Sequence, residues 1–211
     1  MKHLIQVEED CMTKKEAETD LFVYDLLKEA GITVNAQGSI IKEVDEALKT
    51  ASKKGTGNVG YPEYVGKIKD FLIVIEDKAD VAKHIKNEGS VIAQDTDAVV
   101  NYAVNGALFY AKHLIENTSI KEIFAIGVSG DAKHHRITPV FVNTTTDYKQ
   151  LPDVESFIAF NADRWHYFHE GLKNKDISQM IKHVNRPQVS KNRNDWARQT
   201  LKEIPLVNGW H

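Results

Sequence analysis

The chain has almost no cysteine, since Cys11 is the only one among its 211 residues. A single thiol excludes an internal disulfide and fits a reducing compartment. Long apolar runs are also missing: the longest, around Phe71 to Ile75, is far too short to cross a bilayer. The start of the chain turns acidic too early for a signal peptide. We therefore expect a cytoplasmic protein with no membrane segment.

An excess of basic residues is absent as well. The formal net charge is -3 and the isoelectric point is near 6.3, whereas a nucleic-acid-binding protein usually carries a basic patch. This counts against a free-standing DNA enzyme, and less against a domain that other domains deliver to DNA. The apolar and charged fractions are ordinary for a globular protein.

Hydrophobic periodicity predicts helices and strands in the order α-α-β-β-α-β-β. They are expected at residues 13–30, 40–51, 61–65, 70–77, 95–116, 122–128 and 137–142, with a short helix at 79–84. Thr13 and Glu16 have the spacing of a capping box at the start of the first helix. The first two strands should form a hairpin turning near Gly66-Lys67, and the last two should turn at Ser129-Gly130-Asp131.

The strand at 70–77 is apolar on both faces, which is typical of a central strand covered by helices on each side. The expected fold is therefore α/β with three layers, a mixed central sheet flanked by helices. Composition changes after about Thr144. We expect one domain at residues 1–148, and a helical extension or linker to a following domain at 149–211.

The end of this central strand carries the strongest chemical signal. Glu63 precedes a short turn, and the strand ends in Glu76-Asp77-Lys78. Because strand side chains alternate, Glu76 and Lys78 share a face while Asp77 points away. Two carboxylates and an ammonium can hold a hard divalent cation and activate a water beside it. An acid and a lysine at a strand end are often only solvated, but Glu63 at this spacing and the preceding helix favour a site.

This arrangement resembles the PD-(D/E)XK nuclease motif, in particular the N-terminal endonuclease domain of type I restriction enzyme R subunits and of type IIG restriction enzymes. The resemblance spans roughly Thr13 to Val142 and implies a restriction-endonuclease-like fold. The sequence departs from the family at Gly106, where a glutamine is usual, and neighbouring Asn105 is the candidate substitute. The chain contains neither a Walker A sequence nor a methyltransferase motif.

The resemblance implies roles for individual residues. Glu63, Glu76 and the carbonyl of Asp77 would hold Mg2+, with Mn2+ as a substitute, and Lys78 would stabilise charge on the phosphate. Glu16 would bind the metal through water or orient the lysine, although a helix cap also explains it. Further candidates are Tyr110 and Asn105 behind the site, and Lys53, Lys54, Lys67 and Lys69 as phosphate contacts. A tyrosine at helical spacing, such as Tyr110, is more often a core residue than a functional one.

The implied function is a Mg2+-dependent DNA endonuclease of a restriction-modification system. Its partners would be double-stranded DNA and methyltransferase, specificity or motor domains in the same chain or complex. A repair-type or phage-type nuclease would share the motif. A different class remains open: a nuclease-fold module that no longer cuts and serves in DNA binding or assembly.

Overall fold

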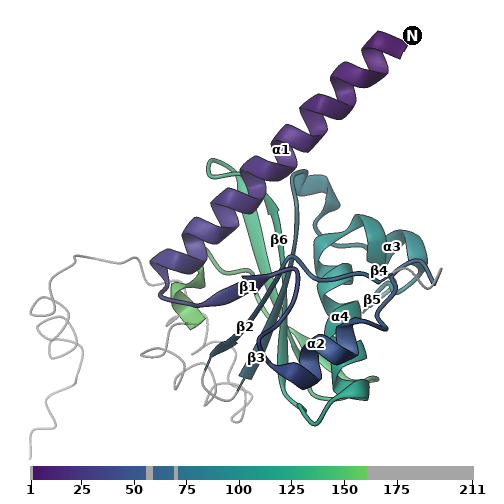
Figure 1. The fold of residues 1–211 in the computed structure, drawn as a ribbon, viewed down its shortest axis with the longest axis vertical. Helices are drawn as coiled ribbons and strands as arrows, with labels where there is room; N and C mark the ends of the chain where they lie inside the picture. The colour runs from purple at the N-terminus through teal and green to yellow at the C-terminus, as the bar shows by residue number, and fades with distance from the viewer. Residues whose placement is uncertain (1, 56–58, 69–70, 161–211) are drawn as a thin grey trace, which may run out of the picture.

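The structure is a computed structural model that describes residues 2–55, 59–68 and 71–160. A six-stranded mixed sheet lies at its centre, in the order β1-β2-β3-β6-β7-β8 (Figure 1). β3 and β6 run parallel, and the other neighbouring strands are antiparallel. The strands are β1 (Val34–Ala36), β2 (Tyr64–Ile68), β3 (Phe71–Lys78), β6 (Ile123–Gly130), β7 (His135–Val142) and β8 (Tyr148–Gln150).

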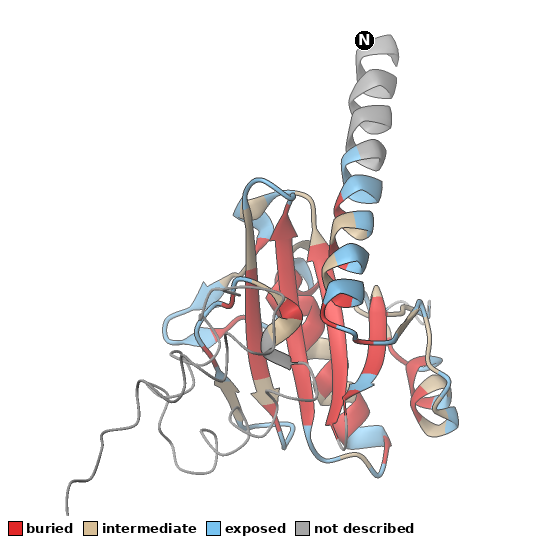
Figure 2. Ribbon diagram, turned by 90° about the vertical axis from the view of Figure 1, so that its left-hand side faces the viewer, coloured by how far each residue is buried: buried red, intermediate tan, exposed pale blue. Residues whose placement is uncertain are grey.

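Helices cover both faces of the sheet. The side chains of Ile73 and Ile75 pack in a core with α1 (Lys2–Glu29) on one face. Leu72 and Val74 pack on the other face with α2 (Lys42–Leu48) and α4 (Ala103–Asn117). Every residue of β3 before Lys78 is buried, as the red central strands in Figure 2 show. The three-layer α/β prediction, with a doubly covered central strand, is therefore confirmed.

The first helix differs from its prediction at its start. It begins at Lys2, so Thr13 lies in its interior and the expected capping box is wrong. Its inward stripe contains Val23 and Leu27, whereas Leu21 is 62% exposed. Two apolar stripes run along this helix, and contact with the sheet decides which one is buried.

The long helix expected at 95–116 is in fact two helices, α3 (Thr96–Asn101) and α4. Tyr102 separates them with an extended backbone, φ -122 and ψ 134. The N–H of the following Val104 donates to the carbonyl of His84, a tertiary hydrogen bond that periodicity cannot foresee. The break allows α4 to turn and lie along β3 and β6.

Both predicted turns were misplaced. β2 continues through Gly66-Lys67, and Gly66 pairs with Ile73 of β3. The missing side chain of Gly66 allows β1 to approach closely and does not form a turn. A Cβ there would lie 2.8 Å from the carbonyl oxygen of Thr33. The β6 and β7 strands are also longer than expected and turn at 131–134.

Small elements fill the crossover between β3 and α3. The helix expected at 79–84 is a single 3-10 turn, η1 (Val81–Lys83). A two-stranded hairpin follows, formed by β4 (Asn87–Glu88) and β5 (Val91–Ile92), with Gly89 at positive φ between them.

The packed core extends beyond residue 148, where we expected the domain to end. β8 joins the sheet, and a second 3-10 turn, η2 (Phe157–Phe160), follows it. Leu151, Val154 and Phe157 are buried in the same core as α1. The predicted helical extension falls mainly on 161–211, outside the described residues.

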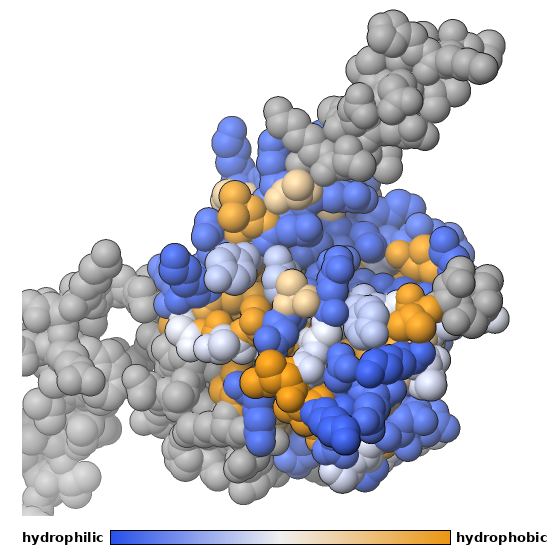
Figure 3. Space-filling view, in the orientation of Figure 1, coloured by the Kyte–Doolittle hydropathy of each residue, from blue (hydrophilic) through white to orange (hydrophobic). Residues whose placement is uncertain are grey.

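The surface is mixed in character. On the face shown in Figure 3, hydrophilic residues predominate and hydrophobic ones occur in separate groups. The most exposed large apolar residue of the described part is Ile40, at 85%. None of the described helices is long and apolar enough to span a membrane.

Candidate active site

Glu63, Glu76 and Lys78 lie on one face at one end of the sheet. Tyr64 pairs with Ile75 and Val65 with Val74, so the next register position sets Glu63 beside Glu76. Val65 and Val74 belong to the core under α2 and α4, and residues two positions along a strand share a face. The structure thus brings these three candidates to the same side; alternation predicted this for Glu76 and Lys78, and the strand register adds Glu63.

Glu76 is buried together with a lysine that the sequence analysis assigned elsewhere. Its side chain is 1% exposed, and its Oε2 accepts from Lys53 Nζ at 2.5 Å. The Lys53 side chain is 16% exposed. We expected Lys53 to contact DNA from a solvated loop, but its ammonium lies inside the protein on a candidate metal ligand.

Tyr110 and Gly106 of α4 surround the ammonium of Lys53. The Tyr110 ring centroid lies 4.8 Å from Lys53 Nζ, a cation–π contact. One turn earlier, a Cβ at Gly106 would come within 3.1 Å of both Lys53 Nζ and Glu76 Oε2. The position where the family carries glutamine is thus occupied by the ion pair, and neither Gln nor Asn fills it.

Asn105 points away from this site. Its side chain is fully buried, and Nδ2 donates to the carbonyl oxygens of Lys86 and Ala93. Its Oδ1 accepts from the backbone N–H of Lys86. These bonds attach the β4–β5 hairpin to α4, so the contacts of Asn105 are structural ones.

Asp77 lies on the opposite face of β3, where α1 covers the sheet. The carboxyl of Asp20 in α1 lies close to it. Burial and, after it, the nearby carboxylates of Asp20, Glu63 and Glu76 together raise the pKa of Asp77 to about 8. Asp20 of α1 thus adds negative charge to the site.

Glu16 lies one turn before Asp20 and is exposed. Between them, Thr19 is buried and its hydroxyl donates to the carbonyl of Gly130, at the end of β6. This contact sets the rotation of α1 and directs Asp20 toward the sheet. Sequence reasoning missed Asp20, although a helix position four residues after Glu16 falls on the same face.

The electrostatics of the site favour a bound cation. Burial raises the pKa of Glu63, and the neighbouring Glu76 and Asp20 raise it further, while Lys78 and Lys53 lower it. Among the described residues, the buried side-chain atoms without a hydrogen bond are Ser52 Oγ, Glu76 Oε1 and Asp77 Oδ2. Unpaired buried carboxylate oxygens beside other acids fit a hard divalent ion.

The site is not assembled as a finished metal cage. No three His, Cys, Asp or Glu side chains of the described ranges are gathered closely enough to hold an ion as they stand. The reasons are visible in the geometry. Asp77 directs its carboxylate to the far side of β3, and Lys53 holds one oxygen of Glu76.

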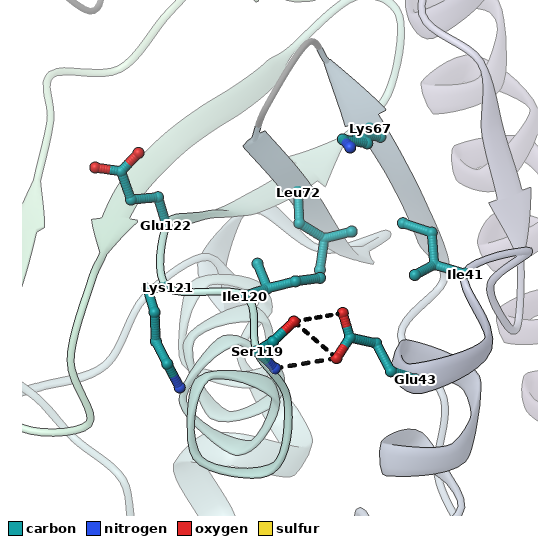
Figure 4. A pocket seen from close by; sticks show the side chains of 8 residues that line it. All are labelled: Ile41, Glu43, Lys67, Leu72, Ser119, Ile120, Lys121 and Glu122. Carbon is teal, nitrogen blue, oxygen red and sulfur yellow. Dashed lines mark hydrogen bonds between the residues drawn. The ribbon is translucent and has the colours of Figure 1, made fainter.

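The other predicted phosphate contacts are dispersed. Lys54 is exposed next to Lys53, while Lys69 lies outside the described residues. Lys67 is at the opposite end of β2 from Glu63, where it borders a hollow of about 590 Å³ (Figure 4). There Glu43 of α2 accepts hydrogen bonds from Ser119.

A buried polar chain that the sequence analysis did not single out runs beside the site. Ser129, which pairs with Lys78 across the parallel strands, hydrogen-bonds His84 Nδ1 at 2.7 Å. His84 Nε2 lies 2.6 Å from Thr138 Oγ1, which donates to Asp153. Asp153 in turn pairs with Arg136 at the surface.

Comparison with known proteins gives one informative match. The chain is 36% identical over 162 residues to the type II restriction enzyme and methyltransferase RM.BcgI of Heyndrickxia coagulans. The alignment covers 75% of this chain but only 25% of that protein, so the chain spans about a quarter of the relative's length. No protein-family model and no solved structure matches the chain. The similarity establishes a relation to a restriction enzyme.

Proposed function

We propose that this chain is the DNA-cleaving part of a restriction-modification enzyme, a Mg2+-dependent endonuclease of the PD-(D/E)XK type. The observation that carries the proposal is the grouping of Glu63, Glu76 and Lys78 on one face, with a buried carboxylate oxygen of Glu76 left unpaired. The similarity to RM.BcgI supports it independently, since that relative is named as a restriction enzyme.

In this proposal Glu63 and Glu76 hold the ion through their carboxylates, and the backbone carbonyl of Asp77 is a further ligand. Bound Mg2+ supplies polarisation of the scissile phosphate and activation of water. Lys78, half-buried at the end of the same strand, stabilises the charge that grows on the phosphate. Such electrostatic contributions amount to about 3 to 4 kcal/mol in comparable sites.

The partners follow from the relative's name and the chain's coverage of it. RM.BcgI is both a restriction enzyme and a methyltransferase, and this chain matches only a quarter of it. We infer that the chain acts on double-stranded DNA alongside methyltransferase and specificity domains, which read the sequence. With a net charge of -3, the chain is suited to delivery by such domains.

Nicking of supercoiled plasmid in Mg2+ or Mn2+ tests the proposal. The wild type should nick, and Lys78→Ala should lower the rate by about two orders of magnitude. Lys149→Ala is the matched control, because Lys149 is also half-buried on a strand but lies in β8 at the far edge of the sheet. Equal rates for wild type and Lys78→Ala would contradict the proposed role.

One observation favours a second candidate function. Lys53 forms an ion pair with Glu76 and neutralises its charge. A permanent ion pair at this position would suit a module that binds DNA without cutting it. Calorimetry with Mn2+ separates the two functions even where nicking by the isolated chain is slow. If the chain is a nuclease, the wild type should bind Mn2+ and the Glu76→Gln variant should not. If it is a non-cutting module, it should bind DNA without any metal.

A further inference from the structure

The Lys53–Glu76 pair stands out because neither partner could remain buried and charged alone. The carboxylate is 1% exposed, and the ammonium that neutralises it comes from a loop 23 residues earlier in the chain. Removing one member of such a pair leaves an uncompensated charge in a poorly solvated place. The lysine therefore does for Glu76 what a bound cation would do.

The surroundings hold the lysine in this position. Tyr110 lies under its ammonium, and the absence of a side chain at Gly106 leaves room for it. The loop is closed at its base, where the N–H of Gly60 donates to the carbonyl of Ala51 at 2.9 Å. Tyr110 Oη also lies against Gly60, since a Cβ there would come within 2.7 Å of it. The same tyrosine thus supports the ammonium and the end of its loop.

The pair occupies only part of the carboxylate. Glu76 Oε2 accepts from Lys53, while Oε1 has no hydrogen-bond partner. A divalent ion that takes Glu76 as a ligand would lie within a few ångströms of the ammonium, and like charges at that separation repel strongly where water is scarce. A divalent ion on Glu76 Oε1 and the ammonium on Oε2 therefore repel each other, and binding of the ion weakens the contact with Lys53.

We propose that Lys53 is a built-in counter-ion of the metal site, which neutralises Glu76 in the metal-free protein and is displaced when a divalent cation binds. The proposal rests on the metal site of the proposed function. Lys53 is thus a positioning residue for metal loading, and its release from Glu76 accompanies metal binding.

Calorimetric titration with Mn2+ in the absence of DNA tests the competition. Lys53→Met keeps the apolar stem but removes the charge, so it should bind Mn2+ about tenfold more tightly than the wild type. The same variant should melt at a lower temperature in EDTA and gain more from added Mn2+. Lys54→Met, which removes an exposed charge next to it, should alter neither quantity.

Amine acylation followed by mass spectrometry tests the displacement in the wild type. Reactivity of Lys53 should rise several-fold on addition of Mn2+, while that of Lys54 stays constant as an internal reference. Lys54 is exposed, and we expect it to stay exposed when Mn2+ binds, so its reactivity should not change. Unchanged reactivity of Lys53 in saturating Mn2+ would show that the ion pair persists and would overturn the proposal.

The outcomes distinguish a failure of the counter-ion role of Lys53 from a failure of the proposed metal site. Mn2+ binding by the wild type with equal or weaker affinity in Lys53→Met leaves the metal site standing and refutes the counter-ion. No Mn2+ binding by the wild type refutes the site and the counter-ion together. Should Lys53→Met fail to fold in EDTA, Lys53→Gln, which keeps a hydrogen-bond donor without the charge, is titrated in its place and judged by the same criterion.

Discussion

His84 Nε2 donates a hydrogen bond to Thr138 Oγ1, 2.6 Å away in the interior. The direction follows from the neighbours, because the Thr138 hydroxyl gives its only proton to Asp153. Nε2 therefore carries the proton, and Nδ1 accepts from Ser129. Burial and, after it, the charge of Arg136 lower the pKa of His84, Asp153 acts in the opposite direction, and the net result is a pKa of about 4. The ring is neutral in the folded protein at neutral pH.

A pH dependence of stability follows from this shift. The unfolded chain takes up a proton near pH 6.5, and the folded chain does so only near pH 4. Stability should therefore fall as the pH drops from about 6.5 to 4, by up to about 1.4 kcal/mol per pH unit from this residue. Urea unfolding across this range should show a shallower dependence in His84→Gln. His134→Gln, which alters an exposed histidine, should retain the wild-type slope.

Gly127 allows α4 to approach the sheet beside the candidate site. It pairs with Glu76 across β3 and β6, and a Cβ on it would lie 2.5 Å from the backbone nitrogen of Val104. Gly127→Ala should therefore lower the free energy of unfolding by about 3 kcal/mol. At Gly89 nothing lies within 4 Å of an added Cβ. Gly89→Ala should cost only about 1 kcal/mol, from its left-handed backbone, and equal losses for the two variants would contradict the packing argument.

Asn105 should prove structural when it is replaced. Asn105→Ala removes three hydrogen bonds of a fully buried side chain and leaves backbone groups of Lys86 and Ala93 unpaired. We expect a loss of about 3 kcal/mol in unfolding free energy, measured by chemical denaturation. The Mn2+ affinity of the folded variant should stay within twofold of the wild type, whereas a larger drop would support the role that the family resemblance implies.

Asp20 and Glu16 of α1 should behave differently when they are replaced. Asp20 acts on the charge state of both Asp77 and Glu63, while Glu16 is exposed one turn away. Loss of a nearby negative charge weakens attraction for a cation. Asp20→Asn should therefore weaken Mn2+ binding about threefold, and Glu16→Gln should leave it unchanged in the same calorimetric titration. The reverse order would restore Glu16 as the helix residue of the site.

Much of the candidate site could be recognised in the sequence, because it depends on local periodicity. A run that is apolar on both faces indicates a covered strand, and alternation along that strand places Glu76 and Lys78 together. Glu63 joins them because antiparallel pairing of adjacent strands fixes which residues lie opposite each other. A turn at Gly66-Lys67 would instead set Glu63 opposite Asp70, so the register that places Glu63 beside Glu76 was decided by the longer β2 of the structure.

What the sequence by itself determined is the three-layer class, the buried central strand and the acidic, lysine-bearing end of that strand. Tertiary packing alone decided that Lys53 reaches Glu76, that Asp20 rather than Glu16 approaches Asp77, and that a helix breaks at Tyr102. The physical reason is range. Periodicity acts between residues a few positions apart, whereas a buried ion pair or the rotation of a helix depends on partners that only the folded chain brings together.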